Sequence, residues 1–109
     1  MIQGITTTEG RQHTALMLES KSEVVAGVSP GRYGQEVMGV PVYDKVSEAL
    51  KRHKIDVSVI FVPKNAVTSA ALEAIQENIP LIIICTADIP VTETIKIKTS
   101  ASQKNSTII

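Results

Sequence analysis

The chain has 109 residues, 43% of them hydrophobic, which is enough for one packed core but not for two. Its 11 basic and 11 acidic side chains balance, which argues against nucleic acid or an anionic membrane as a partner, and no apolar run reaches the roughly 20 residues that span a bilayer. A lone cysteine, Cys85, excludes an internal disulfide and a cysteine-based zinc site, so we expect a soluble protein of the reducing cytoplasm, or of the mitochondrial matrix if a transit peptide has been removed.

The hydrophobic pattern of the first half switches between short extended runs and helical stripes. In chain order it predicts a strand at Met1–Ile5, a helix at Arg11–Lys21, a strand at Glu23–Val28, a loop at Ser29–Gly39 and a strand at Val40–Tyr43. Asp44 is then a favourable N-cap for a helix that ends near Lys54, because apolar residues recur at helical spacing behind it.

The second half continues this alternation. It predicts a strand at Val57–Val62, a helix capped by Asn65 and ended near Asn78 by Pro80, a strand at Leu81–Cys85 and the start of another at Thr107–Ile109. The run at Leu81–Cys85 is apolar throughout, so we expect a central strand that is buried on both faces. The pattern of Val91–Ser102 fits either a helix or a strand.

Strands that alternate with helices predict an α/β fold, with a Rossmann-like, doubly wound and mostly parallel sheet that carries helices on both faces. In such a sheet, ligands bind beyond the carboxyl ends of the strands. The turns expected at that edge are Thr6–Gly10, Ser29–Gly34, Pro63–Asn65 and Thr86–Pro90.

The turn between the first strand and the first helix is a candidate phosphate site. Gly4 and Gly10 frame it, and backbone N–H groups at such a helix N-terminus can cradle a pyrophosphate. A threonine replaces the middle glycine of the usual dinucleotide fingerprint, so the motif alone is weak. The alternative is an ordinary threonine-rich turn that caps a helix.

The loop after the second strand discriminates among nucleotides. An NAD-binding domain places an acid about 20 residues beyond the glycine turn, but no acid follows that point before Glu36. Arg32 lies there instead, and a cation suits the phosphorylated ribose of NADP or the 3′-phosphate of coenzyme A. A solvated loop arginine is the alternative. Lys64, which follows another strand, is also placed to reach a phosphate.

The remaining reactive side chains point to no catalytic site. His13 lies near the phosphate turn, where it suits a neutral polar contact, and His53 ends an apolar helical stripe. Neither has a carboxylate or cysteine at metal-binding spacing, so we expect no metal. Cys85 ends a buried strand and fits a packing residue at the ligand edge.

Several short stretches, taken in order, resemble one family. They are Gln3–Thr6, Glu9–Gly10, His13, Ala26–Arg32, Gly39–Tyr43, Val59–Pro63, Leu72–Ile75 and Ile89–Pro90. In this combination the chain resembles the N-terminal coenzyme A-binding domain of the succinyl-CoA ligase (succinyl-CoA synthetase) α subunit. The resemblance implies a Rossmann-like fold, in agreement with the fold that the hydrophobic pattern predicts.

The resemblance also implies a set of contacts to coenzyme A. The glycine turn and the turn after the most apolar strand hold the cofactor in this family, as does a basic residue after Pro-Gly. The implied cofactor-binding residues are Thr6, Thr7, Thr8, Glu9, Arg32, Cys85, Thr86 and Ala87. The sequence departs from the family at Thr7 and Tyr33, where glycines are usual, and at Ala87–Asp88, where Glu-Gly is usual.

Subunits of this family carry a second domain with a phosphorylated histidine, and they pair with a β subunit. Neither histidine here corresponds to that residue. We therefore expect residues 1–109 to be a single domain, truncated at both ends, that binds coenzyme A or acyl-CoA and is inactive alone. The parent enzyme would convert succinyl-CoA, a nucleoside diphosphate and phosphate to succinate, coenzyme A and the triphosphate. The alternatives are a free-standing, non-enzymatic module that binds coenzyme A or regulates, and an NADP-binding domain.

Overall fold

The computed structural model describes residues 1–109 and contains one seven-stranded sheet. Its strands are β1 (Ile2–Gln3), β2 (Gly27–Val28), β3 (Glu36–Val37), β4 (Val40–Tyr43), β5 (Val57–Ile60), β6 (Leu81–Ile84) and β7 (Thr107–Ile108). They lie in the order β3-β4-β2-β1-β5-β6-β7, and all neighbours are parallel except β3 and β4. Apart from β3, this is the strand order of a Rossmann fold, with its switch point between β1 and β5. The predicted fold class is confirmed.

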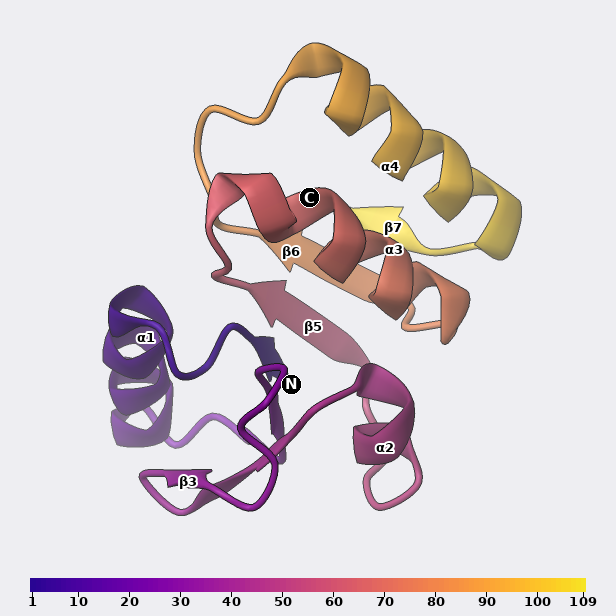
Figure 1. The fold of residues 1–109 in the computed structure, drawn as a ribbon. Helices are drawn as coiled ribbons and strands as arrows, with labels where there is room; N and C mark the ends of the chain where they lie inside the picture. The colour runs from indigo at the N-terminus through magenta and orange to yellow at the C-terminus, as the bar shows by residue number, and fades with distance from the viewer.

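Helices cover the two faces of this sheet unequally. They are α1 (Thr8–Glu19), α2 (Val46–Leu50), the short 3-10 helix η1 (Lys64–Ala66), α3 (Val67–Gln76) and α4 (Val91–Lys104). One core cluster joins α2, α3 and α4 to one face of the sheet, and a smaller cluster joins α1 to the other. Figure 1 shows α3 and α4 side by side along β6 and β7, with α1 well apart from them. No helix has the length and apolar character needed to cross a bilayer.

The unequal cover corrects one prediction about β6. Ile82 is fully buried on the face that α3 and α4 cover, but Leu81 and Ile83 belong to neither core cluster and are only partly buried. They point to the face of α1, which packs on β1 rather than on β6. The strand therefore lies inside the sheet, between the parallel strands β5 and β7, but it is not fully buried on both faces, and the middle strand of the sheet is β1.

The segment Ser29–Gly39, expected to be a loop, contains β3. Glu36 and Val37 pair antiparallel with Pro41 and Val40 across a tight turn. Met38 and Gly39 both have positive φ, of 50° and 84°, which is the geometry of the type I′ turn that matches strand twist. The sequence pattern missed this hairpin because only Gly39 signals it.

The helix expected from Asp44 to Lys54 is shorter than predicted, and its cap is different. α2 ends at Leu50. Asp44 Oδ1 instead accepts a hydrogen bond from the Tyr33 N–H (3.1 Å), and the Val46 N–H at the start of α2 donates to Glu73 Oε2 of α3 (2.8 Å). A distant residue thus satisfies the helix start, which no local pattern reveals.

Two other helices start at residues other than those predicted, and the ambiguous segment forms a helix. α1 begins at Thr8 rather than Arg11, because Thr7 caps it. Asn65 lies within η1 and caps nothing, so α3 begins at Val67 without a side-chain cap. The ambiguous segment is helix α4, which ends at Lys104; its C-cap, Asn105, has the left-handed conformation (φ 62°) that asparagine tolerates.

Candidate functional site

A cavity of about 520 Å³ opens at the carboxyl ends of β1, β5 and β6. Three segments line it: the start of α1, the residues after β5 and the residues after β6. The lining residues are Thr7, Thr8, Glu9, Phe61, Val62, Pro63, Lys64, Cys85, Thr86 and Ala87. This is the edge at which the sequence predicts a ligand, next to the switch point of the sheet.

The first wall is the N-terminus of α1, which Thr7 organises. The Thr7 hydroxyl accepts a hydrogen bond from the Gly10 N–H (3.0 Å) and donates one to the Gly4 carbonyl oxygen (2.7 Å). The N–H groups of Thr8 and Glu9 have no acceptor in the chain, as is usual for the first turn of a helix. Two backbone donors and the positive end of the helix dipole therefore meet the cavity.

The two glycines that frame this turn are needed for different reasons. Gly4 has a φ of +85°, a conformation that favours glycine. Gly10 packs so closely on the Gly4 carbonyl that a Cβ there would overlap it. Thr7, by contrast, has an ordinary φ of −70°. The backbone therefore accommodates a side chain at the position where the resembling family has glycine.

The second wall follows β5 and is held from two sides. The Phe61 ring is buried and stacks on the His13 imidazole of α1, with ring centroids 4.6 Å apart and planes at 22°. The Thr86 hydroxyl donates to the Val62 carbonyl oxygen (2.7 Å) and so ties the turn after β6 to the turn after β5. His13 thus supports the cavity wall from behind and does not line the cavity.

The cavity lining contains two charged side chains and one thiol. Glu9 and Lys64 are its only charged lining residues, and neither takes part in the one ion pair of the structure, Lys96–Glu93. Partial burial raises the pKa of the Cys85 thiol, so this cysteine stays protonated and is a weak nucleophile near neutral pH. The structure contains no group of His, Cys, Asp and Glu side chains that could hold a metal ion.

Two of the residues assigned from the sequence lie outside the lining. Thr6 is directed to the neighbouring loop: its N–H and its hydroxyl both contact Ser29 Oγ (3.3 and 2.9 Å). Arg32 is exposed on that loop, and its N–H donates to the Ser29 carbonyl oxygen (3.1 Å). The Thr6–Ser29 contact therefore joins the Arg32 loop to the phosphate turn without bringing Arg32 into the cavity.

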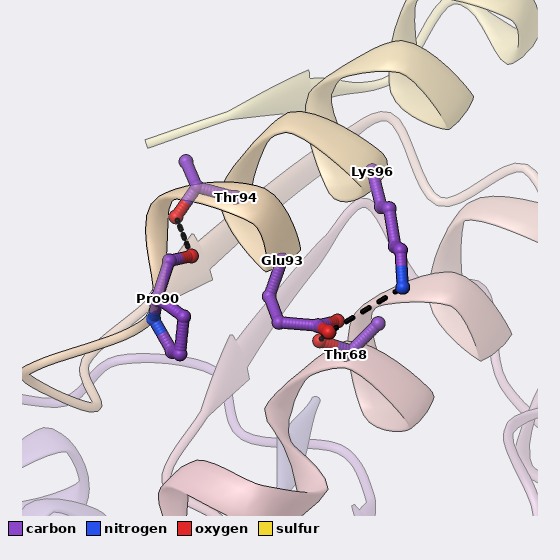
Figure 2. Close-up of polar contacts among 5 residues, drawn as sticks. All are labelled: Thr68, Pro90, Glu93, Thr94 and Lys96. Atoms are coloured by element: carbon purple, nitrogen blue, oxygen red, sulfur yellow. Dashed lines mark hydrogen bonds and ion pairs between the residues drawn. The ribbon is translucent and has the colours of Figure 1, made fainter.

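A polar contact that the sequence does not reveal holds α4 against α3. Figure 2 shows the Glu93 carboxylate between Thr68 of α3 and Lys96, one turn further along α4. The Thr68 hydroxyl donates to Glu93 Oε2 (2.8 Å), and Lys96 Nζ lies 3.4 Å from Oε1. The Thr68 hydrogen bond, with a smaller contribution from Lys96, lowers the pKa of Glu93. This contact fixes the helix that follows the turn at Thr86–Pro90.

Comparison with known families and curated proteins gives consistent matches. The family described as the CoA binding domain matches residues 1–88. The chain is 41% identical over 109 residues to the ADP-forming succinate–CoA ligase subunit alpha 2 of Archaeoglobus fulgidus, and 39% identical over 108 residues to the ADP-forming sulfoacetate-CoA ligase subunit SqwL of an Acholeplasma species. These matches cover 100% and 99% of this chain but only 38% and 36% of the relatives' lengths.

Solved structures share the fold at low sequence identity. A conserved hypothetical protein from Pyrococcus furiosus aligns with a TM-score of 0.75 at 18% identity, over 98% of this chain and 89% of that one. The dinucleotide-forming acetyl-coenzyme A synthetase 1 of Ca. Korarchaeum cryptofilum aligns with a TM-score of 0.72 at 17% identity, over 99% of this chain and 25% of that one. At these identities the likeness concerns the fold alone.

Proposed function

Since this chain belongs to the CoA-binding domain family, we propose that it binds coenzyme A in the cavity between α1, β5 and β6. The observation that carries the proposal is the pair of free N–H donors at Thr8 and Glu9, which open onto that cavity. Backbone N–H groups at a helix N-terminus suit a pyrophosphate, which coenzyme A contains.

The rest of the cofactor is assigned to the neighbouring turns. Arg32 lies on the loop that Thr6 and Ser29 hold beside the phosphate turn, which supports a contact with the 3′-phosphate from outside the cavity. Cys85, Thr86 and Ala87 form the far side of the lining, which suits the uncharged pantetheine arm. Thr7 acts on the ligand indirectly, by holding the first turn of α1 in place.

We further propose that the chain serves as the coenzyme A-binding part of an ADP-forming succinate–CoA ligase α subunit. The 41% identity to such a subunit supports this role. In it, the chain supplies cofactor binding, while a phosphorylated histidine and a β subunit supply the transfer of phosphate. No lining residue is placed as a catalytic nucleophile, since Cys85 is a protonated thiol. The chain alone is therefore expected to be inactive in a coupled ligase assay.

Thermal unfolding with and without coenzyme A tests the binding. A ligand that binds only the folded chain, at 100 times its dissociation constant, stabilises it by about 2.7 kcal/mol and raises the melting temperature by about 10 °C. NADP is the control, because it shares a pyrophosphate and a phosphorylated ribose with coenzyme A but lacks the pantetheine arm. A shift with coenzyme A alone supports the proposal. An equal or larger shift with NADP would contradict it.

A further inference from the structure

The charged residues around the cavity point to a binding role for one lysine. Glu9 and Lys64 are the only charged lining residues, so the lining is neutral as a whole. Without Lys64, an anionic ligand would meet the Glu9 carboxylate with only uncharged donors, the backbone N–H groups and threonine hydroxyls, to offset it. Arg32 cannot make up the difference inside the cavity, because it does not line it.

The backbone holds Lys64 in a defined place opposite α1. Lys64 is the first residue of η1 and follows Pro63, whose φ of −57° and extended ψ direct the chain out of β5. The Pro63 carbonyl accepts from the Ala66 N–H (2.8 Å), which closes the turn. The Lys64 ammonium has no ion pair and no hydrogen bond within the chain. It is an exposed cation, free to contact a ligand in the cavity.

From this placement we propose that Lys64 contacts the pyrophosphate of coenzyme A, across the cavity from the Thr8 and Glu9 N–H groups. Arg32 then contacts only the 3′-phosphate, so the two cations bind different phosphate groups of the cofactor. This inference rests on the proposed function, since it names a residue of the same site. Lys64 is a binding residue here and takes no part in any covalent step.

The test compares two ligands with and without the Lys64 charge. Coenzyme A and dephospho-coenzyme A share the pyrophosphate, and only the first has the 3′-phosphate. By isothermal titration calorimetry of the full chain, Lys64→Gln should weaken both ligands equally, by about tenfold or more. Lys64→Arg keeps the positive charge and should retain most of the affinity. Lys64→Glu reverses the charge and should lower the affinity more than Lys64→Gln does. Arg32→Gln should weaken coenzyme A but leave dephospho-coenzyme A unchanged.

Controls separate this inference from the proposed function. Lys54→Gln removes an exposed lysine near β5 and the chain's first residue, at the opposite edge of the sheet, and should change neither affinity. Equal melting temperatures of the unliganded variants show that folding is intact. Unchanged binding by Lys64→Gln would overturn the inference while the wild-type chain still binds. If Lys64→Gln weakened the binding of coenzyme A but not of dephospho-coenzyme A, the inference would also be overturned, because Lys64 would then contact the 3′-phosphate. A wild-type chain that binds neither ligand would refute the proposed function itself.

Discussion

At the scale of single residues, Thr7 lies in the proposed phosphate turn, but its side chain stabilises the turn and does not face the ligand. Its one hydroxyl accepts from Gly10 and donates to Gly4, so both its hydrogen-bonding roles are occupied within the chain. A second carbonyl oxygen, that of Phe61, lies 3.3 Å from the hydroxyl. The threonine therefore links the strand, the turn and the helix, and it presents the neighbouring backbone, rather than its own side chain, to the cavity.

Removing this cap should cost stability. We expect Thr7→Ala to lower the free energy of unfolding by about 1 kcal/mol, the usual cost of losing an N-cap hydroxyl, with the melting temperature lower by about 5 °C. Thr7→Ser keeps the hydroxyl and should retain most of the stability. Thr8→Ala, at an exposed neighbour that makes no side-chain hydrogen bond, is the matched control. An unchanged melting temperature for Thr7→Ala would show that the cap is dispensable.

At the scale of elements, the contact between Glu93 and Thr68 makes the docking of α4 dependent on pH. The hydrogen bond from Thr68 lowers the pKa of Glu93 in the folded chain. A lowered carboxyl pKa contributes stability above the ordinary value of about 4.3, and this contribution is lost as the pH falls through the folded value. Because the Glu93 side chain is only partly buried, we expect a small effect.

Thermal melts of Thr68→Val between pH 7 and pH 3 test this dependence. The variant lacks the donor, so it should be less stable than the wild type at neutral pH, and the difference should shrink as the pH drops below about 4.3. Glu93→Gln removes the carboxylate that accepts this hydrogen bond, so the stability of this variant should also lose its dependence on pH in this range. Thr99→Val, at an exposed position of α4, is the control. A gap between wild type and Thr68→Val that widens in acid would contradict the assignment.

Local signals explain which elements could be predicted from the sequence. β5 and β6 are apolar and rich in β-branched residues, and turn residues bound them, so their existence follows from composition. The start of α2 does not, because its first N–H is satisfied by Glu73, 27 residues further along the chain. β3 is two residues long, and a single glycine marks its turn.

The candidate site shows the same limit. Strand ends and turns place Thr7, Thr8, Glu9 and the residues after β6 at one edge, because parallel strands end together. Which side of that edge a loop residue takes depends on tertiary contacts. Arg32, on the Ser29 loop, lies outside the cavity lining, whereas Lys64 of η1 belongs to it. The sequence motif favours Arg32 as the phosphate contact, whereas the structure places Lys64 in the cavity lining.

At the scale of the whole molecule, two core clusters share one sheet. The larger includes Ile97 of α4, and the smaller includes Val37 of β3. The buried strand β1 joins them, with Ile2 packed in the smaller cluster and Gln3 bonded across to α3 through the Ala70 carbonyl oxygen (2.9 Å). We infer that neither cluster is stable without the other.

This arrangement predicts one cooperative unfolding transition for the whole chain. Ile97→Ala should lower the free energy of unfolding by about 2 to 5 kcal/mol, and Val37→Ala should also be destabilising. Both should shift the same single transition, whether it is followed by far-ultraviolet circular dichroism or by calorimetry. Thr107→Ala, at an exposed edge position, should leave the melt nearly unchanged. A second transition in either core variant would show that the two faces unfold separately.

The stacking of His13 on Phe61 makes the NMR chemical shifts of His13 sensitive to what occupies the cavity. One face of the Phe61 ring packs on the imidazole at 4.6 Å, while the residue itself lines the space proposed for coenzyme A. Ring currents from Phe61 displace the proton resonances of His13, and a ligand that moves or covers the phenyl ring alters that displacement. The chain has only two histidines and one phenylalanine, so comparison with a His53→Gln variant is enough to identify the His13 resonances. Occupancy can thus be followed in unlabelled protein, from outside the site.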